Sequence, residues 1–281
     1  MKKLLVTMMK GGTGKTMLVC QLARYAHAKG LRVLVVDIDD QMNTSSCLLR
    51  GEGVQKLPFS TTQVYRDRIA NIDFWDSSFT VLCSDATIKS TITEQMMATD
   101  ANGEYIGDNA VHNLSHFMQQ ADQHFDLCIL DTPSGMDHSI VCAMACADFV
   151  LAPIEFTPEC MEGITALLSG PRSIPTIREF NPSLKFLGFL PNKVEATEKQ
   201  KAIMADLIDS GSMGSFVCDD QGRLLSIPKR QALLQVQAEG ISLAEFAKIN
   251  SQARSAFPTV RRVFDSLLGK MMLDATGEDH E

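Results

Sequence analysis

Short apolar runs alternate with segments of helical spacing along most of this chain. Runs rich in Val, Ile, Leu and Phe are each short enough for a buried strand, and they occupy 4–8, 32–37, 79–83, 125–130, 149–153, 184–190 and 215–217. Between them, apolar residues recur every three or four positions, as in the helix predicted after residue 15 that ends at Gly30. Strands that alternate with helices indicate βαβ units. We therefore predict an α/β fold with a mostly parallel, twisted sheet flanked by helices.

The same pattern predicts one domain. No linker rich in Pro, Gly or Ser divides the chain, so we expect a single domain over 1–273, followed by a disordered acidic tail over 274–281. Residues 84–108 fit the alternation worst, and we interpret them as an excursion with a helix around 91–97. The role of this excursion is left open.

Composition narrows the class of protein. Of the 281 residues, 45% are hydrophobic and 21% are charged, which allows a sizeable core and excludes global disorder. No run approaches the roughly 20 apolar residues of a membrane span. The apolar start of the chain is broken by Lys10 and the glycines after it, which argues against a secretion signal. We expect a cytoplasmic protein.

The net charge of −8 is unevenly distributed. Residues 171–270 hold 14 Lys and Arg against 10 Asp and Glu, whereas residues 1–170 hold 12 against 20. An acidic average argues against a protein that coats nucleic acid with its whole surface, but it leaves room for a basic face in the last third.

A glycine-rich segment joins the first strand to the first helix, and it is the strongest chemical signal in the chain. Its sequence is Lys10-Gly11-Gly12-Thr13-Gly14-Lys15-Thr16. A strand, a tight loop and a helix N-terminus direct backbone N–H groups at one point, where the helix dipole also favours an anion. Lys15 then reaches the terminal phosphates of a nucleotide and the Thr16 hydroxyl binds Mg²⁺. These residues predict a phosphate-binding loop, and with it a P-loop NTPase fold.

Two later strands end in acids. The second strand ends at Asp37 and is followed by Asp39, and the strand over 125–130 is followed by Asp131. Carboxylates facing a phosphate repel it unless Mg²⁺ lies between them, so the pattern favours a metal-assisted site. The residues alone also allow an acidic loop that caps a helix at Asn43 or Thr44.

The glycine-rich segment resembles the deviant Walker A loop of the ParA/MinD superfamily. The strict phosphate-loop pattern wants Gly at position 9, which is Met here, whereas the superfamily pattern Lys-Gly-Gly-x-Gly-Lys-Thr is met in full. The resemblance implies an ATPase with ATP and Mg²⁺ as cofactors, in which Lys10 reaches the nucleotide of the partner in an ATP-bound homodimer. It makes Lys10, Lys15 and Asp39 the catalytic residues, with Asp39 orienting the attacking water, and Thr16, Asp39 and Asp131 the metal site.

Downstream segments extend the resemblance over about residues 3–268. Ala152-Pro153-Ile154 with Gly163 resembles the superfamily's strand–Pro–loop segment. By the same resemblance Asn192 and Pro228 lie against the base. The predicted nucleotide site is then Gly11, Gly12, Thr13, Gly14, Lys15, Thr16, Met17, Asn192 and Pro228, with Met17 contributing only its backbone N–H.

Four functions remain open at this point. The first is a ParA-type ATPase that positions plasmid, chromosome or protein cargo, binds DNA nonspecifically at the nucleoid and is stimulated by a ParB-like adaptor. Its DNA contacts would come from Arg223, Lys229, Arg230, Arg254, Arg261, Arg262 and Lys270. The first strand begins within five residues of Met1, so we expect no helix-turn-helix before it.

The other three functions are a MinD-like membrane ATPase, an iron–sulfur reductase and a metabolic enzyme such as a dethiobiotin or cobyrinate synthetase. The apolar residues of 260–272 could form a membrane-surface helix, but the acidic tail would repel an anionic membrane, so we expect a helix packed into the core and no membrane partner. Cys142 and Cys146 lack the spacing that a cluster carrier needs. The metabolic enzymes have no need of Lys10.

Overall fold

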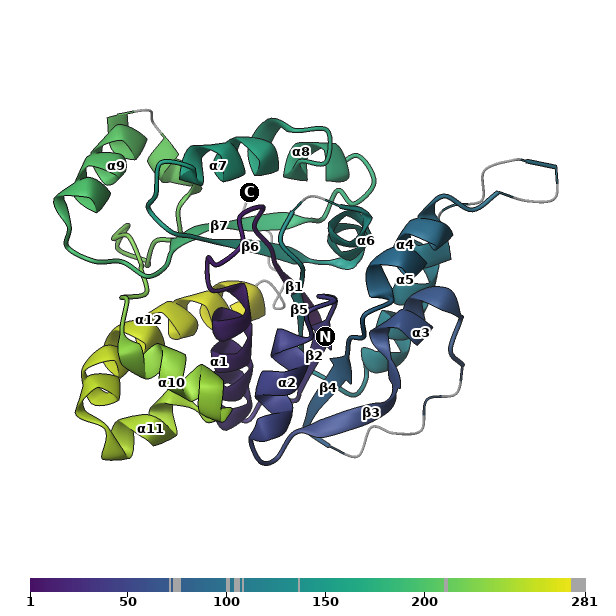
Figure 1. Cartoon of the computed structure of the whole chain (residues 1–281), viewed down its shortest axis with the longest axis horizontal. Helices are drawn as coiled ribbons and strands as arrows, with labels where there is room; N and C mark the ends of the chain where they lie inside the picture. Colours follow the sequence, from purple (N-terminus) through teal and green to yellow (C-terminus); the bar gives the residue numbers. More distant parts are fainter. Residues whose placement is uncertain are drawn as a thin grey trace.

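The structure is a computed structural model that describes residues 1–70, 72, 77–99, 102–103, 107, 109–135, 137–209 and 212–273. A seven-stranded sheet runs through its centre in the order β3-β4-β2-β5-β1-β6-β7, and every strand pair in it is parallel (Figure 1). The strands are β1 (Lys2–Val6), β2 (Val33–Asp37), β3 (Gln55–Ser60), β4 (Phe79–Cys83), β5 (Leu127–Asp131), β6 (Phe149–Ile154) and β7 (Lys185–Pro191). The predicted α/β fold with a parallel sheet is confirmed.

Helices cover both faces of this sheet. They are α1 (Lys15–Ala28), α2 (Asn43–Arg50), α3 (Thr61–Arg66), α4 (Ile88–Met96), α5 (Asn109–Ala121), α6 (His138–Cys146), α7 (Cys160–Ser169), α8 (Ile174–Ile177), α9 (Glu198–Asp209), the 3₁₀ turn η1 (Ser212–Ser215), α10 (Gln231–Glu239), α11 (Leu243–Ile249) and α12 (Ser251–Leu273). Figure 1 shows α1, α10, α11 and α12 gathered on one side of the sheet and α6, α7 and α8 on the other.

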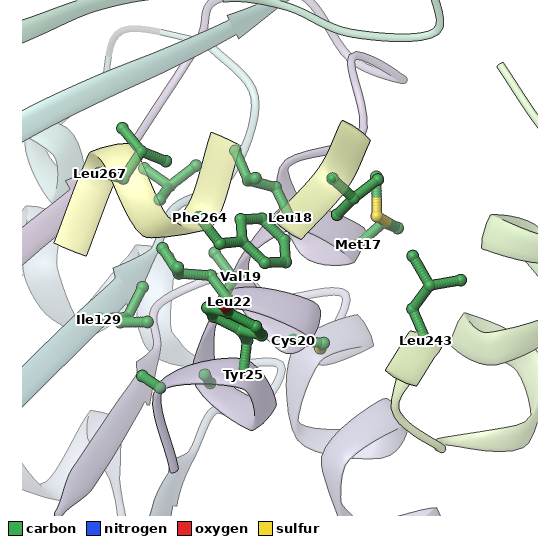
Figure 2. Close-up of a cluster of buried hydrophobic side chains, with 14 of the residues drawn as sticks. Met17, Leu18, Val19, Cys20, Leu22, Tyr25, Ile129, Leu243, Phe264 and Leu267 are labelled. Atoms are coloured by element: carbon green, nitrogen blue, oxygen red, sulfur yellow. The ribbon is translucent and has the colours of Figure 1, made fainter. Parts of the chain in front are cut away.

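The core has two halves because side chains alternate across each strand. Leu4 of β1 faces the half built with α1, α10, α11 and α12, whereas Leu5 faces the half built with α3 to α8. In the first half, Leu18 of α1 lies beside Phe264 of α12, with Leu267 further along α12 (Figure 2). Leu4, Leu5, Leu18, Phe264 and Leu267 are all buried. Helices α1 and α12 are therefore packed in the core next to the point where the glycine-rich loop leads into α1.

The last helix packs into the core as expected. Val260, Val263, Phe264, Leu267 and Met271 are each at most 2% exposed, so the apolar stripe of α12 has no face left for a lipid surface. Among the described residues, the structure has no helix of the length and apolar character that crossing a membrane requires.

One predicted strand was wrong, and one strand of the sheet was missed. The predicted strand over 215–217 is a single bridge between Phe216 and Phe189 beside η1. The strand β3 was missed because Pro58 lies within it, and proline disfavours a strand except at a sheet edge, which is where β3 lies. The predicted tail over 274–281 lies outside the described residues.

Candidate functional site

The glycine-rich loop lies at the centre of the sheet's carboxyl edge. It follows β1, which pairs with β5 on one side and β6 on the other. Gly14 forms the N-cap of α1 with φ 87°, a left-handed conformation that glycine adopts without steric cost. The loop therefore meets the N-terminus of a 14-residue helix at a crossover in the strand order, where parallel α/β proteins bind their ligands.

Lys15 is a buried cation under this loop. Its side chain bonds the Ser134 hydroxyl at 3.0 Å and the Met8 carbonyl at 3.4 Å, and the residue is 7% exposed. Burial lowers the pKa of its ammonium group, although the Asp131 and Asp39 carboxylates oppose that shift. An ammonium group buried at the start of a helix attracts an anion strongly, because little water screens its charge.

Two buried carboxylates lie side by side at the ends of β2 and β5. Asp37 and Asp131 are partners in the strand register, and both are essentially inaccessible to solvent. Burial raises the pKa of Asp131 to about 7, with the Asp37 charge adding to the effect, and burial raises the pKa of Asp37 to about 6. Asp37 is satisfied by Ser45, whose backbone N–H and hydroxyl donate to one oxygen at 2.8 and 2.6 Å.

Asp131 is only half satisfied. The Thr16 and Thr44 hydroxyls donate to its Oδ2 at 3.1 and 2.5 Å, while its Oδ1 is buried without a hydrogen-bond partner among the described residues. A buried carboxylate oxygen without a partner is costly, and a threonine hydroxyl next to it completes a set of hard oxygen donors. These residues fit a divalent cation such as Mg²⁺.

Asp39 stands at the rim of the same site. It is half-buried, burial raises its pKa, and its Oδ1 accepts the Gln41 N–H at 3.0 Å. Its neighbour Asp40 instead forms an ion pair with Lys89 at 3.1 Å and does not line the cavity described next.

A cavity of about 750 Å³ opens over the loop. It joins the loop to the segment after β7 and to α10, and its lining includes most of the predicted site: Gly12, Gly14, Lys15, Thr16, Met17, Asp39, Asn192 and Pro228. Gly11, Thr13 and Asp131 are not among the lining residues, and neither is Lys10; Thr13 is buried with a hydroxyl that has no partner among the described residues. The volume suits a nucleotide.

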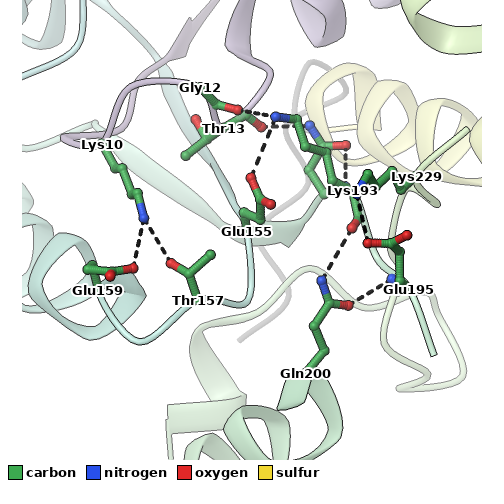
Figure 3. A network of polar contacts seen from close by, with 11 residues as sticks. Lys10, Gly12, Thr13, Glu155, Thr157, Glu159, Lys193, Glu195, Gln200 and Lys229 are labelled. Atoms are coloured by element: carbon green, nitrogen blue, oxygen red, sulfur yellow. Dashed lines mark hydrogen bonds and ion pairs between the residues drawn. The ribbon is translucent and has the colours of Figure 1, made fainter. Parts of the chain in front are cut away.

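Lys10 turns away from this cavity. Its ammonium group bonds Thr157 at 3.0 Å and Glu159 at 2.9 Å, both in the segment between β6 and α7 (Figure 3). The hydrogen bond from Lys10 holds the pKa of the Glu159 carboxyl near 2. The cation that begins the glycine-rich segment is thus held by its own chain, away from its own phosphate site.

Several residues of the site were not predicted from the sequence. Ser134, Thr44 and Lys193 come next to the loop only through the fold, and Leu233 and Gln237 of α10 form the wall beyond Pro228. Lys193 directly follows the predicted Asn192, and its positive φ of 54° is invisible in the sequence.

All seven cations of the predicted basic face have partners within the chain. Arg223 and Arg262 share Asp219, Lys229 pairs with Glu195 at 2.9 Å, and Arg261 lies 3.5 Å from Asp265. Arg230, Arg254 and Lys270 donate to backbone carbonyls. The face is exposed, but its net positive potential is smaller than the count of Lys and Arg suggests.

Comparison with known proteins decides the family. A family model described as an AAA domain matches residues 1–186, more than half of the chain. The chain belongs to this AAA domain family. Among curated relatives, Protein IncC of Escherichia coli is 28% identical over 205 residues, which cover 70% of this chain and 51% of that protein. The chromosome-partitioning ATPase Soj of Thermus thermophilus is 24% identical over 265 residues, 93% of each chain.

This chain therefore spans about half the length of the IncC relative and nearly all of Soj. These relatives confirm the resemblance to the ParA/MinD superfamily that the loop predicted. Solved structures share the fold at lower identity: an ATP complex of McdA from Cyanothece has a TM-score of 0.71 at 19% identity and covers 95% of this chain and 96% of that one.

Two further structures show how widely this fold is shared. The cell division ATPase MinD of Pyrococcus furiosus has a TM-score of 0.61 at 20% identity, covering 95% of this family member and 99% of that chain. Cobyrinic acid a,c-diamide synthase from Mycobacterium smegmatis, with ADP and magnesium, also has a TM-score of 0.61, at 21% identity over 88% and 96%. Fold alone does not separate positioning ATPases from metabolic enzymes.

Proposed function

We propose that this AAA domain protein is a ParA-type positioning ATPase that hydrolyses ATP with Mg²⁺. The observation that carries the proposal is that the glycine-rich loop, Lys15, Thr16 and Asp39 line one cavity, with Asp131 bonded to Thr16 beneath it. The relatives named Soj, IncC and ParA support it, as does the ATP complex of McdA, which has the same fold.

The site residues have different roles toward a bound nucleotide. The loop N–H groups and the buried Lys15 bind the phosphates, and Thr16 and Asp131 would hold Mg²⁺. When bound, that ion neutralises charge that develops on the phosphate oxygens. Asp39, at the exposed rim, orients the attacking water and accepts its proton, a task for which its raised pKa suits it.

The placement of Lys10 supports homodimerisation on ATP. The lysine lies outside its own cavity, so the nucleotide that it contacts is that of a second copy, once its ion pair with Glu159 opens. Hydrolysis in an isolated protomer should then be slow, because a second copy supplies the cation that completes the site.

DNA and an adaptor protein complete the proposal. In the dimer, the basic residues of 223–270 from both copies would contact DNA phosphates without reading sequence, and a ParB-like adaptor would stimulate hydrolysis at the nucleoid.

The test measures phosphate release from ATP by the parent protein, by Asp39→Ala and by Asp67→Ala. We expect slow, EDTA-sensitive release by the parent and by Asp67→Ala, and release at least about a hundredfold slower by Asp39→Ala, which should still bind ATP. Asp67→Ala removes the same charge at an exposed position after α3, outside the cavity. Equal release by the parent and Asp39→Ala would refute the proposed role of Asp39, and no release by the parent under any condition would refute the ATPase itself.

A further inference from the structure

Two consecutive residues after β7 bond to the glycine-rich loop, and Figure 3 shows the second of them, Lys193, beside Gly12. The Asn192 side-chain amide donates to the Thr13 carbonyl at 2.7 Å, and the Lys193 ammonium group donates to the Gly12 carbonyl. Two adjacent carbonyls of the loop therefore accept hydrogen bonds from two adjacent residues of a segment that is distant in the sequence. Both Asn192 and Lys193 also line the nucleotide cavity.

The hydrogen bonds to these carbonyls also fix the orientation of the loop's N–H groups. In a trans peptide the C=O and the following N–H point in opposite directions, so holding the Gly12 and Thr13 carbonyls sets the directions of the Thr13 and Gly14 N–H groups. Neither N–H has a hydrogen-bond partner in the part of the chain that the structure describes. They are free to bind an anion, and they are already oriented.

The segment that contains Asn192 and Lys193 is itself held by hydrogen bonds and burial. Asn192 is 1% exposed, its backbone N–H donates to the Ile154 carbonyl at 2.7 Å, and its Oδ1 accepts the Lys193 N–H at 2.9 Å. Lys193 has φ 54°, a conformation that residues with a side chain rarely adopt and that persists only where the surroundings enforce it. Glu155 lies 3.5 Å from the Lys193 ammonium group and steadies it.

The contact with Asn192 also requires a glycine on the loop side. A Cβ at position 14 would collide with Asn192 Nδ2, so only glycine lets the amide approach this closely. The amide of Asn192 donates one of its two N–H groups to Thr13, and its oxygen accepts the Lys193 N–H. These two hydrogen bonds assign Asn192 to the loop, and the base contact expected of it stays a prediction.

We propose that Asn192 and Lys193 are positioning residues that hold the glycine-rich loop in the shape that binds the diphosphate of a nucleotide. The proposal rests on the proposed function, because it concerns the same nucleotide. It makes a specific claim: the two residues act through the loop's N–H groups, so they contribute equally to binding of ADP and ATP and do not discriminate between bases.

The test is a calorimetric titration of Lys193→Met, Lys193→Arg and the control Lys201→Met with ADP and with a non-hydrolysable ATP analogue. Lys201 is an exposed lysine on α9 that pairs with Glu198 at 2.8 Å, so its replacement removes the same charge outside the cavity. We expect Lys193→Met to weaken both nucleotides by about tenfold, Lys193→Arg to restore affinity to within about threefold, and Lys201→Met to bind like the parent.

Other outcomes overturn the proposal. Loss for the ATP analogue alone means that Lys193 contacts the terminal phosphate directly, and unchanged affinity, or an equal loss in Lys201→Met, means that it positions nothing. If the parent binds neither nucleotide, the proposed function fails first. Thermal unfolding of each variant shows whether a loss of affinity comes from a loss of folding.

A second variant separates the loop from the base. Asn192→Ala removes the donor to Thr13 and also the side-chain oxygen to which a 6-amino group would donate. It should weaken ATP and purine riboside triphosphate, which lacks the 6-amino group, by the same factor. A loss confined to ATP would restore the base contact and overturn the proposal for Asn192.

Discussion

At the scale of single residues, the site depends on one glycine whose conformation and surroundings both exclude a side chain. Gly14→Ala introduces strain at φ 87° and a collision with Asn192. We expect nucleotide affinity to fall by more than about tenfold, since the loop must shift. Nucleotide titration measures the loss.

Gly53→Ala is the matched control for this prediction. It places alanine at φ 75° with nothing within 4 Å, so it carries similar backbone strain without the collision. Its nucleotide affinity should equal that of the parent. If the two alanine variants bind equally well, the contact between Gly14 and Asn192 has no bearing on binding.

The residues of the site were predicted unevenly from the sequence. Lys15 and Thr16 could be placed because the glycine-rich pattern fixes their spacing at the start of α1, and Asp131 because it ends an apolar strand. Ser134 and Lys193 could not, because nothing local marks them: they reach the loop only when β5 and β7 are placed in the sheet. The partner of Lys10, Glu159, was hidden for the same reason.

At the scale of elements, the segment between β6 and α7 restrains Lys10. Glu159→Gln removes the charge that holds the lysine at 2.9 Å, and we expect the protein to dimerise at a lower ATP concentration. The pair is exposed, so folding stability should barely change. Analytical ultracentrifugation over an ATP series measures the shift.

Glu162→Gln, in the first turn of the same α7, serves as the control because it removes an equal charge without touching Lys10. A Glu159→Gln protein that dimerises at the same ATP concentration as Glu162→Gln would show that the contact does not restrain Lys10.

Helix α12 stabilises the half of the core that supports the loop helix. Leu267→Ala removes a fully buried side chain packed with α1, and it should lower the free energy of unfolding by about 3 kcal/mol. Ile249→Ala, at an 82% exposed position, should change it by less than about 0.5 kcal/mol. Urea unfolding separates the two, and a Leu267→Ala protein as stable as Ile249→Ala would contradict the packing of α12 against α1.

Elements were predicted best where their pattern is strong. The central strands are buried on both faces and read as unbroken apolar runs, and α12 carries a clear helical stripe. Edge elements deviated most: β3 carries a proline that only an edge strand tolerates, and the segment around Phe216 forms one bridge instead of a strand. Pairing partners, which settle such cases, are not encoded locally.

At the scale of the whole molecule, DNA binding depends on a face whose charges are largely paired. Replacing Arg261 and Arg262 by Ala should weaken binding to random duplex DNA about equally on all sequences and flatten its salt dependence, because phosphate contacts release counterions. Replacing Lys199 and Lys201 on α9 removes the same charge elsewhere and should have a smaller effect. Mobility assays at low salt with ATP and with ADP compare the two pairs, and equal loss in both would refute the assigned face.

Dimerisation on ATP is the central claim, because it connects Lys10 to hydrolysis and doubles any DNA-binding face. The most direct measurement is the mass in solution of Asp39→Ala, by light scattering with saturating ATP and Mg²⁺ and again with ADP. The account predicts twice the monomer mass with ATP, the monomer mass with ADP, and the monomer mass for the Lys10→Ala, Asp39→Ala double variant with either nucleotide. A monomer at micromolar concentration with ATP bound would contradict it.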